Sequence, residues 1–117
     1  MAQEVFAKLL QQSDISIVVC EFQESLVATC MLATISGLAN GVRPFALIEH
    51  VVIFAAYRGH GFARMALECA LELAWSMDCY KVVLLSGMQR AGAHRLYESV
   101  CFNGSVERGF VAKPNGV

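Results

Sequence analysis

The stretch that decides the fold of this 117-residue chain reads Ile-Glu-His-Val-Val-Ile-Phe-Ala-Ala-Tyr-Arg-Gly-His-Gly-Phe-Ala over residues 48–63. An apolar strand runs into a turn with two glycines and then directly into a helix, predicted from about Phe62 to Met77. Gly59 and Gly61 remove two β-carbons, so backbone amides at the turn can converge on one point. The helix start adds unpaired N–H groups and the positive end of its dipole. Basic side chains surround the same point: Arg58, His60 and Arg64. We call residues 58–64 the cradle, and the sequence predicts that it holds a diphosphate.

Two better-known glycine motifs do not fit this stretch. A dinucleotide-binding fingerprint needs a third glycine where this chain has Arg64. A P-loop ends in Gly-Lys-Ser or Gly-Lys-Thr, which is not found here. What remains is Arg-x-x-Gly-x-Ala over residues 58–63, for which an ordinary strand-to-helix turn is the alternative interpretation. The strand over 48–54 could also pair its backbone groups with an extended, amide-containing ligand.

Length and composition predict one domain, residues 1–117, in a cytoplasmic protein. The formal net charge is −1, which disfavours nucleic acid and anionic membranes as partners. A hydrophobic content of 56% with 16% charged residues predicts apolar surface buried in a homo-oligomer, most simply a homodimer. No apolar run has the length of a membrane span, and the N-terminus lacks a signal-peptide pattern.

The five cysteines are widely spaced and include no Cys-x-x-Cys pair. This pattern indicates neither a metal site nor a disulfide framework. The cysteines are interpreted as small apolar core residues.

The remaining elements follow from periodicity and turn residues. They are, in chain order, a helix over 2–12, a hairpin of strands over 15–22 and 26–36, a loop over 37–44, a strand over 45–54, a strand over 80–86, a helix over 90–100 and closing strands over 103–106 and 109–113. Strand, helix and strand over 45–86 form a crossover that places a ligand crevice at the strand ends.

A second motif, Ala-His-Arg-Leu-Tyr-Glu-Ser-Val-Cys-Phe over residues 93–102, follows at a suitable separation. With residues 58–63 it resembles the GNAT superfamily of N-acetyltransferases. Their acyl-CoA signature reads Gln/Arg-x-x-Gly-x-Gly/Ala and their later helix Ala-x-x-Phe/Leu-Tyr-Glu-x-x-Gly-Phe. Residues 78–85, and the register of 48–53 against Arg58, are similar to the branch containing glucosamine-6-phosphate N-acetyltransferases. The resemblance covers about residues 45–112.

The resemblance implies a single GNAT-like α/β (α+β) domain, with a mixed central sheet flanked by helices. The sheet would splay open between the strands at 45–54 and 80–86, with acetyl-CoA in the gap and no metal. The implied activity is acetyl transfer to the primary amine of a small molecule. The implied cofactor contacts are backbone groups of Val51, Val52 and Ile53 for the pantetheine arm, and Arg58 with the N–H groups of Gly59, His60, Gly61, Phe62, Ala63 and Arg64 for the pyrophosphate.

Two catalytic residues are predicted. Tyr97 stands where the superfamily places a phenol that reaches the CoA sulfur, although a packed tyrosine is the alternative. Glu49 is the expected base, because strand alternation would place it with Val51 and Ile53 on one face. His50 competes for that role, and Glu49 could instead be structural, pairing with Arg43 or with a partner subunit. A backbone N–H near Val51 would hold the oxyanion.

The sequence departs from the superfamily pattern in three places. Cys101 replaces the glycine before Phe102, which predicts a helix end without a left-handed cap. Arg90 replaces a CoA-contacting Asn. Only about fourteen residues precede the first predicted strand, so the usual first strand and helix are expected to be lacking. The alternative function is therefore a non-catalytic CoA-binding or dimerisation module.

Overall fold

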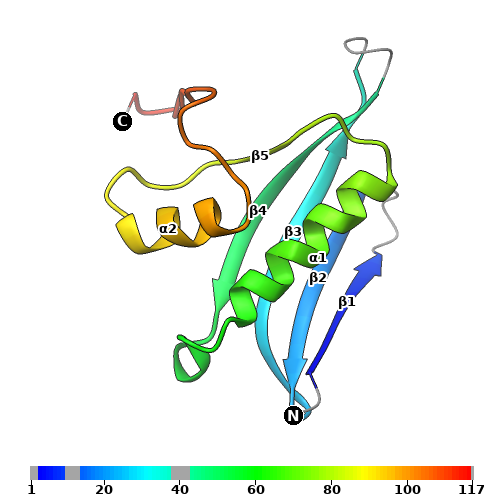
Figure 1. Ribbon diagram of the computed structural model, residues 1–117. Coiled ribbons are helices and arrows are strands. Elements are labelled where there is room, and N and C mark those ends of the chain that lie inside the picture. The colour runs from blue at the N-terminus through cyan, green and yellow to red at the C-terminus, as the bar shows by residue number, and fades with distance from the viewer. Residues whose placement is uncertain (1–2, 10–13, 38–42, 117) are drawn as a thin grey trace. The chain divides into compact units, whose positions relative to one another are not determined.

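The computed structural model describes residues 3–9, 14–37 and 43–116 (Figure 1). Its elements are β1 (Gln3–Leu9), β2 (Ile15–Phe22), β3 (Ser25–Ile35), β4 (Phe45–Ile53), a 3-10 helix η2 (Ala55–Tyr57), α1 (Phe62–Ser76), β5 (Val82–Leu84) and α2 (Ala91–Ser99). The chain divides into two compact units, residues 1–84 with the sheet and α1, and residues 85–117 with α2. Residues 38–42, most of the loop predicted over 37–44, lie outside the described residues.

The first unit is built on a five-stranded sheet in the order β1-β2-β3-β4-β5. Neighbouring strands are antiparallel from β1 to β4, whereas β4 and β5 are parallel because α1 returns the chain between them. The sheet is therefore mixed, as predicted. The predicted hairpin is also confirmed: Gln23 and Glu24 join β2 to β3 with φ values of 51° and 65°, the left-handed conformation of tight hairpin turns.

The N-terminal segment is a strand and not the helix predicted over residues 2–12. β1 pairs along its whole length with β2, from Gln3↔Phe22 to Leu9↔Ser16. The outer edge of β2 would otherwise leave backbone groups unpaired, which favours strand pairing over a surface helix. The sheet thus begins at Gln3 rather than at Ile15. Residues 2 and 10–12 of the predicted helix lie outside the described residues.

Helix α1 lies across one face of the sheet and buries one of its sides there (Figure 1). Small residues recur on the buried side at Ala66, Ala70 and Ala74, which lets the helix approach the strands closely. The outer side carries an exposed polar stripe: Arg64, Glu68, Glu72 and Ser76. The core between helix and sheet includes side chains that are at most 2% exposed, among them Val18, Cys20, Ala28, Cys30, Leu32, Ile48, Phe62, Ala66, Leu67, Ala70 and Ala74.

The second unit contains α2 and a C-terminal segment without regular structure. The closing strands predicted over 103–106 and 109–113 are wrong, because none of the described residues after α2 is in a strand. Instead, Ser105 N–H donates to Asn103 Oδ1 at 2.8 Å and folds the chain into a local turn. The large apolar side chains of these two segments are exposed: Val106, Phe110 and Val111.

Candidate active site

Helix α1 starts from the cradle through two glycines in the left-handed conformation. Gly59 has a φ of 82°, and Gly61, the N-cap residue, has a φ of 80°. A residue with a β-carbon adopts this region at a cost of about 1–2 kcal/mol. A β-carbon built at either position would nevertheless meet no atom within 4 Å. The backbone conformation therefore requires the glycines, and the space beside them is open.

The amide N–H groups of residues 59–64 have no acceptor among the described residues. The amides on either side do: Arg58 N–H donates to Ala55 O at 3.4 Å, and Met65 N–H donates to Gly61 O at 3.1 Å. No side chain caps α1, and its first turn contains no acidic residue. Because helix starts normally find such partners, the cradle presents a run of donors that is ready for an acceptor.

Basic side chains stand at the end of α1 where the helix dipole is positive. Arg58, His60 and Arg64 are all exposed. Arg64 is partly balanced by Glu68 one turn further on, with Nε 3.5 Å from Oε1. A cation in the first turn costs a helix about 0.3–1 kcal/mol, whereas an anion stabilises it by a similar amount. The cations and the helix dipole therefore both favour the binding of an anion at this end of α1.

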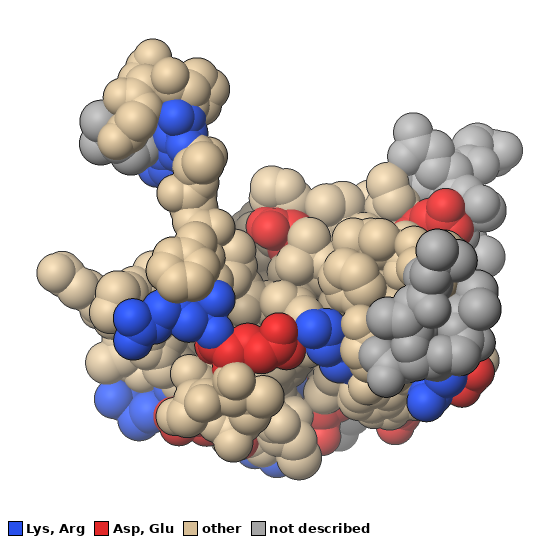
Figure 2. Space-filling view, turned by 90° about the horizontal axis from the view of Figure 1, so that it is seen from above, with Lys and Arg blue, Asp and Glu red and all other residues tan. Residues whose placement is uncertain are grey.

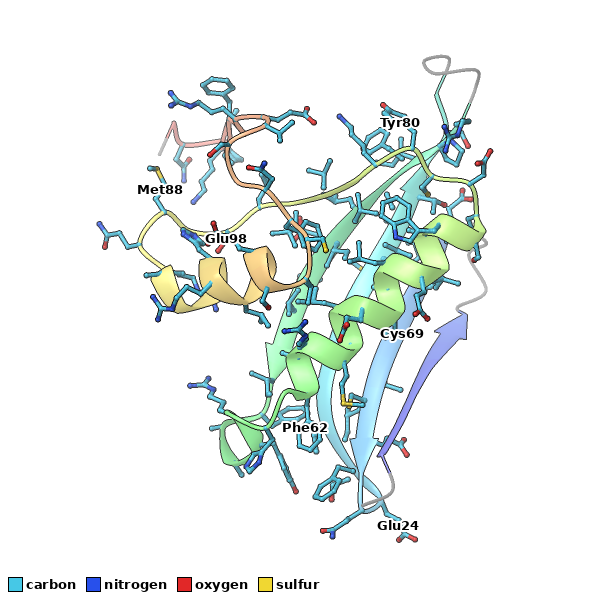
Figure 3. The ribbon with its side chains drawn as sticks, viewed as in Figure 1. Glu24, Phe62, Cys69, Tyr80, Met88 and Glu98 are labelled. Atoms are coloured by element: carbon cyan, nitrogen blue, oxygen red, sulfur yellow. The ribbon has the colours of Figure 1, made fainter. Side chains whose placement is uncertain are left out.

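Phe62 anchors the cradle to the sheet (Figure 3). Its buried ring has its centroid 5.2 Å from that of Phe22 at the end of β2. Tyr57, before the glycine turn, lies 6.3 Å from the Phe62 ring, and His60, within the turn, lies 5.8 Å from it. One buried ring thus holds the turn from both sides, so the amides are fixed in place before any ligand binds.

Charged side chains are scattered over the face shown in Figure 2 rather than gathered into one basic field. The formal net charge of −1 agrees with this picture. An anion would therefore be selected by the local donors and cations of the cradle and not by the charge of the whole protein.

Strands β4 and β5 separate along the part of β4 that leads to the cradle. Their pairing covers Ala46–Ile48 against Val82–Leu84, whereas β4 continues to Ile53. Within the described residues, β4 therefore has a strand partner only on its β3 side from Glu49 onward. The predicted splay of the sheet is confirmed. The backbone of residues 51–53, predicted to pair with pantetheine, lies on this unpaired part.

A β-bulge interrupts β4 next to the splay. The register against β3 advances by two residues from Met31 to Thr29, but by three residues on β4, from Glu49 to Val52. His50, inside the bulge, has a φ of 54°. A left-handed residue other than glycine in the middle of a strand is strained, and such strain is concentrated at functional sites.

The bulge changes which side chains share a face of the sheet. Glu49 and Val52 lie on the face away from α1, because their partners in β3 lie there. Ile53 is opposite Ala28, a core residue under α1, and so lies on the other face. The prediction that Glu49 shares one face with Val51 and Ile53 is therefore wrong, because regular alternation does not survive an extra residue.

Glu49 is half-buried, and its carboxylate forms no ion pair with any described residue. The alternative that it pairs with Arg43 is not realised. Arg43 instead pairs with Asp78 after α1, Nε to Oδ1 at 3.3 Å, and donates to the carbonyls of Asp78 and Cys79. His50, the competing base, is exposed beside Glu49.

Tyr97 belongs to the second unit, near the end of α2. Its ring is buried and meets Phe102 edge-on, with centroids 6.2 Å apart. Phe102 N–H donates to Tyr97 O at 3.0 Å, and Cys101 N–H donates to Glu98 O at 3.2 Å. Cys101 itself has a φ of 78°. These are the bonds of a left-handed helix cap, so the prediction that α2 lacks one is wrong: Cys101 adopts the conformation usually left to glycine.

The buried thiols are poor candidates for nucleophiles. Burial raises the pKa of the Cys30 thiol to about 12, and neighbouring Cys69 adds to the shift. Burial also raises the pKa values of Cys20, Cys69 and Cys79. Such thiols carry little thiolate near neutral pH.

The part of the chain that the structure describes shows neither a metal site nor a membrane span. No group of His, Cys, Asp and Glu side chains there could hold a metal ion. No helix there is long and apolar enough to span a bilayer.

The sequence profile of the Acetyltransferase (GNAT) family matches residues 2–101, which include parts of both compact units. The chain belongs to the GNAT acetyltransferase family. The resemblance read from the two motifs is thereby confirmed. Among curated protein sequences, none matches the chain.

Solved structures agree with the family assignment. A putative acetyltransferase from Agrobacterium tumefaciens is 36% identical with a TM-score of 0.83, over 87% of this chain and 70% of that one. A transcriptional regulator from Bacillus halodurans is 26% identical with a TM-score of 0.78, over 86% and 67%. A glucosamine-6-phosphate N-acetyltransferase from Arabidopsis thaliana is 22% identical with a TM-score of 0.70, over 86% and 68%, and shows the fold alone.

As a GNAT acetyltransferase, the protein is an enzyme that uses acetyl-CoA as the acetyl donor. Open amides next to cations, as in the cradle, are groups that can bind a diphosphate. The sequence analysis did not predict the bulge at His50. A glycine at that position would have indicated it, but the residue is a histidine. The bond between Arg43 and Asp78, which joins segments far apart in the chain, was not predicted either.

Proposed function

We propose that the protein transfers the acetyl group of acetyl-CoA to the primary amine of a small molecule, by direct attack of the amine on the thioester. The observation that carries the proposal is the run of amides over residues 59–64, which have no acceptor among the described residues, beside the separated strands β4 and β5. Arg58 and Arg64 would add charge-assisted contacts to the diphosphate. Backbone groups of residues 51–53 would pair with the amide-containing arm of the donor.

Glu49 is the proposed base. An amine attacks only when unprotonated, so its proton must pass to an acceptor, here the Glu49 carboxylate directly or through one water. The amine nitrogen forms a bond to the acetyl carbon while the carbon–sulfur bond breaks. Tyr97 is proposed to donate its phenolic proton to the departing CoA thiolate, and the proton held by Glu49 then returns through solvent to the Tyr97 phenolate. The products are then the acetamide and CoA thiol, with no covalent enzyme intermediate.

The oxyanion that forms on the thioester oxygen needs a donor. A backbone N–H near Val51 is the proposed one, and the bulge supports this choice because it releases His50 and Val51 from the regular register with β3. The strained φ of 54° at His50 is consistent with a backbone shaped for this purpose.

The test is CoA release from acetyl-CoA, followed with a thiol reagent, across a panel of primary amines. We expect at least one amine to be acetylated. Glu49→Gln should lower kcat about 100-fold and steepen its pH dependence, whereas Tyr97→Phe should lower kcat about tenfold with little change in acetyl-CoA binding. Tight CoA binding without turnover on any amine would instead favour the alternative, a non-catalytic CoA-binding module.

The proposed partners are the amine substrate and a second copy of the chain. The dimer is supported by the 56% hydrophobic and 16% charged composition. Sedimentation equilibrium should give twice the chain mass of 12.8 kDa, and a monomer at micromolar concentration would contradict it. A cytoplasmic location stays a prediction.

A further inference from the structure

Thr29 is a polar neighbour of the proposed base on the face of the sheet away from α1. Glu49 of β4 is directly opposite Met31 of β3, and Thr29 comes two residues further along β3, opposite Val52. Thr29 and Glu49 are therefore diagonal neighbours, with Cα atoms about 7–8 Å apart. The other strand residues that pairing and alternation place around Glu49 on this face carry no side-chain nitrogen or oxygen: Met31, Ala33, Leu47 and Val52.

The Thr29 hydroxyl acts as a hydrogen-bond acceptor toward this face. Its Oγ1 donates to Val18 O of β2 at 3.0 Å. A carbonyl oxygen carries no proton, so the hydroxyl proton points to it and the two lone pairs of the hydroxyl oxygen are left as acceptors. The side chain is half-buried, so part of it is open to a ligand. Thr29 thus offers an acceptor within one small molecule's reach of the Glu49 carboxylate.

We propose that Thr29 binds the acceptor amine and makes the enzyme selective for primary over secondary amines. This rests on the proposed function, in which the amine nitrogen reacts beside Glu49. Once a primary amine has attacked the thioester, its nitrogen carries two protons. One passes to Glu49, directly or through water, and the other remains as the N–H of the acetamide. The proton that remains donates a hydrogen bond to Thr29 Oγ1.

A secondary amine lacks this second proton. After attack its nitrogen has a single N–H, and that proton must pass to Glu49 for the amide to form. An alkyl group then stands where the primary amine has its N–H, and the half-buried Thr29 oxygen loses its partner. A site that hydrogen-bonds one substrate disfavours an analogue that cannot form the bond.

The experiment pairs the primary amine of the panel that reacts fastest with its N-methyl derivative, for example hexylamine with N-methylhexylamine, at saturating acetyl-CoA. In the wild type, kcat/KM for the primary amine should be at least tenfold higher. Thr29→Val keeps the branched shape but removes the oxygen, and should narrow this ratio at least fivefold, because only the primary amine loses a hydrogen bond. Thr29→Ser keeps the oxygen and should retain the ratio.

Thr34→Val is the matched control. Thr34 is also a threonine of β3 whose Oγ1 donates to a backbone carbonyl, Asp14 O at 3.4 Å. It has the alternation of Cys30 and Leu32 and so lies on the α1 face, roughly 17 Å along the strand from Thr29. Thr34→Val should leave the ratio of the two amines unchanged.

The outcomes are distinguishable. An unchanged ratio in Thr29→Val, including an equal loss of kcat/KM with both amines, would show that Thr29 only stabilises the fold, and would leave the proposed acetyl transfer intact. Binding of acetyl-CoA without acetylation of any amine would overturn both. Thr29→Ala carries the same prediction and takes the place of Thr29→Val should the valine variant not fold.

Discussion

The two ends of helix α1 are completed in opposite ways. At its C-terminal end, Asp78 adopts a φ of 62°, Asp78 N–H donates to Trp75 O and Cys79 N–H donates to Ala74 O. The Arg43 side chain reaches the carbonyls of Asp78 and Cys79 as well. The chain therefore supplies partners for its own backbone at this end, in the bond pattern of a left-handed cap.

At its N-terminal end, the same helix has left-handed residues too but leaves its amides without acceptors among the described residues. The charges are also reversed relative to what the helix dipole favours: Arg58 and Arg64 stand at the positive end, and Asp78 at the negative end. A helix start that lacks both a cap and a favourable charge is suited to a ligand that supplies them. The contrast between the two ends supports the N-terminal end as the binding site, and two changes test it. Two further changes test the middle of α1 and the end of α2.

The largest effect is expected from Gly61→Ala. Its φ of 80° strains any other residue, at about 1–2 kcal/mol of folding free energy. The new methyl group meets no atom of the chain but would project into the open space of the cradle. Acetyl-CoA affinity measured by calorimetry should fall at least 30-fold. Gly116→Ala is the matched control, with a φ of 69° and equally open surroundings. Equal affinity in both variants would contradict the assignment.

The middle of α1 differs from both ends, because side-chain packing against the sheet stabilises it rather than hydrogen bonds to terminal backbone groups. The Cys30 thiol faces Ala66 of α1, with Sγ 3.9 Å from its carbonyl oxygen, and burial raises its pKa to about 12. An unfolded thiol ionises near pH 8.5, so only the unfolded state gains from ionisation as the pH rises above that value. Between pH 8 and pH 10 the free energy of unfolding should fall by about 2 kcal/mol from this group. Urea titrations at both pH values should show a fall that is smaller by this amount in Cys30→Ala than in the wild type. An equal fall in the two proteins would contradict the prediction.

Arg64→Gln separates binding from stability at the N-terminal end. The variant loses the pairing with Glu68, worth at most about 0.5 kcal/mol, but also removes a cation from the positive end of the dipole. Its thermal midpoint without ligand should therefore stay within about 2 °C of wild type, while acetyl-CoA affinity falls about tenfold. Arg108→Gln, in the exposed C-terminal segment, should change neither. A lower thermal midpoint with unchanged acetyl-CoA affinity would show that Arg64 stabilises the fold and does not bind the ligand.

Cys101→Gly has the smallest expected effect and concerns the end of α2, which is capped in the same way as that of α1. Glycine removes the strain of a φ of 78°, so the free energy of unfolding should rise by about 1 kcal/mol. Acetyl-CoA affinity should stay within a factor of two. A destabilised variant would show that the cysteine side chain contributes packing that outweighs the strain.

The parts of the fold that the sequence predicted are those set by local residues. The hairpin, β4, α1 and α2 each follow from periodicity and turn residues within their own segments. β1 was missed because its seven residues fit the helical period as well as the strand period. Pairing with β2 decides for the strand, and the segment's own sequence does not show that pairing. The bulge at His50 and the cap at Cys101 were missed because the left-handed residues are not glycine, so the sequence carried no sign of the conformation.

The candidate site also contains features that depend on local residues and features that depend on strand pairing. The cradle could be predicted because its glycines and cations are adjacent in the chain, and its unpaired amides follow from the missing cap. The side chains that share a face with Glu49 could not be predicted, since one extra residue in β4 reverses the alternation after it.

The most direct test of the cradle is a titration of the ¹⁵N-labelled protein with acetyl-CoA and, separately, with pantetheine, which lacks the diphosphate. The amide resonances of residues 59–64 should move downfield with acetyl-CoA, as free N–H groups gain acceptors, and stay in place with pantetheine. Saturable binding of acetyl-CoA that leaves these resonances unmoved would contradict the assignment of the cradle.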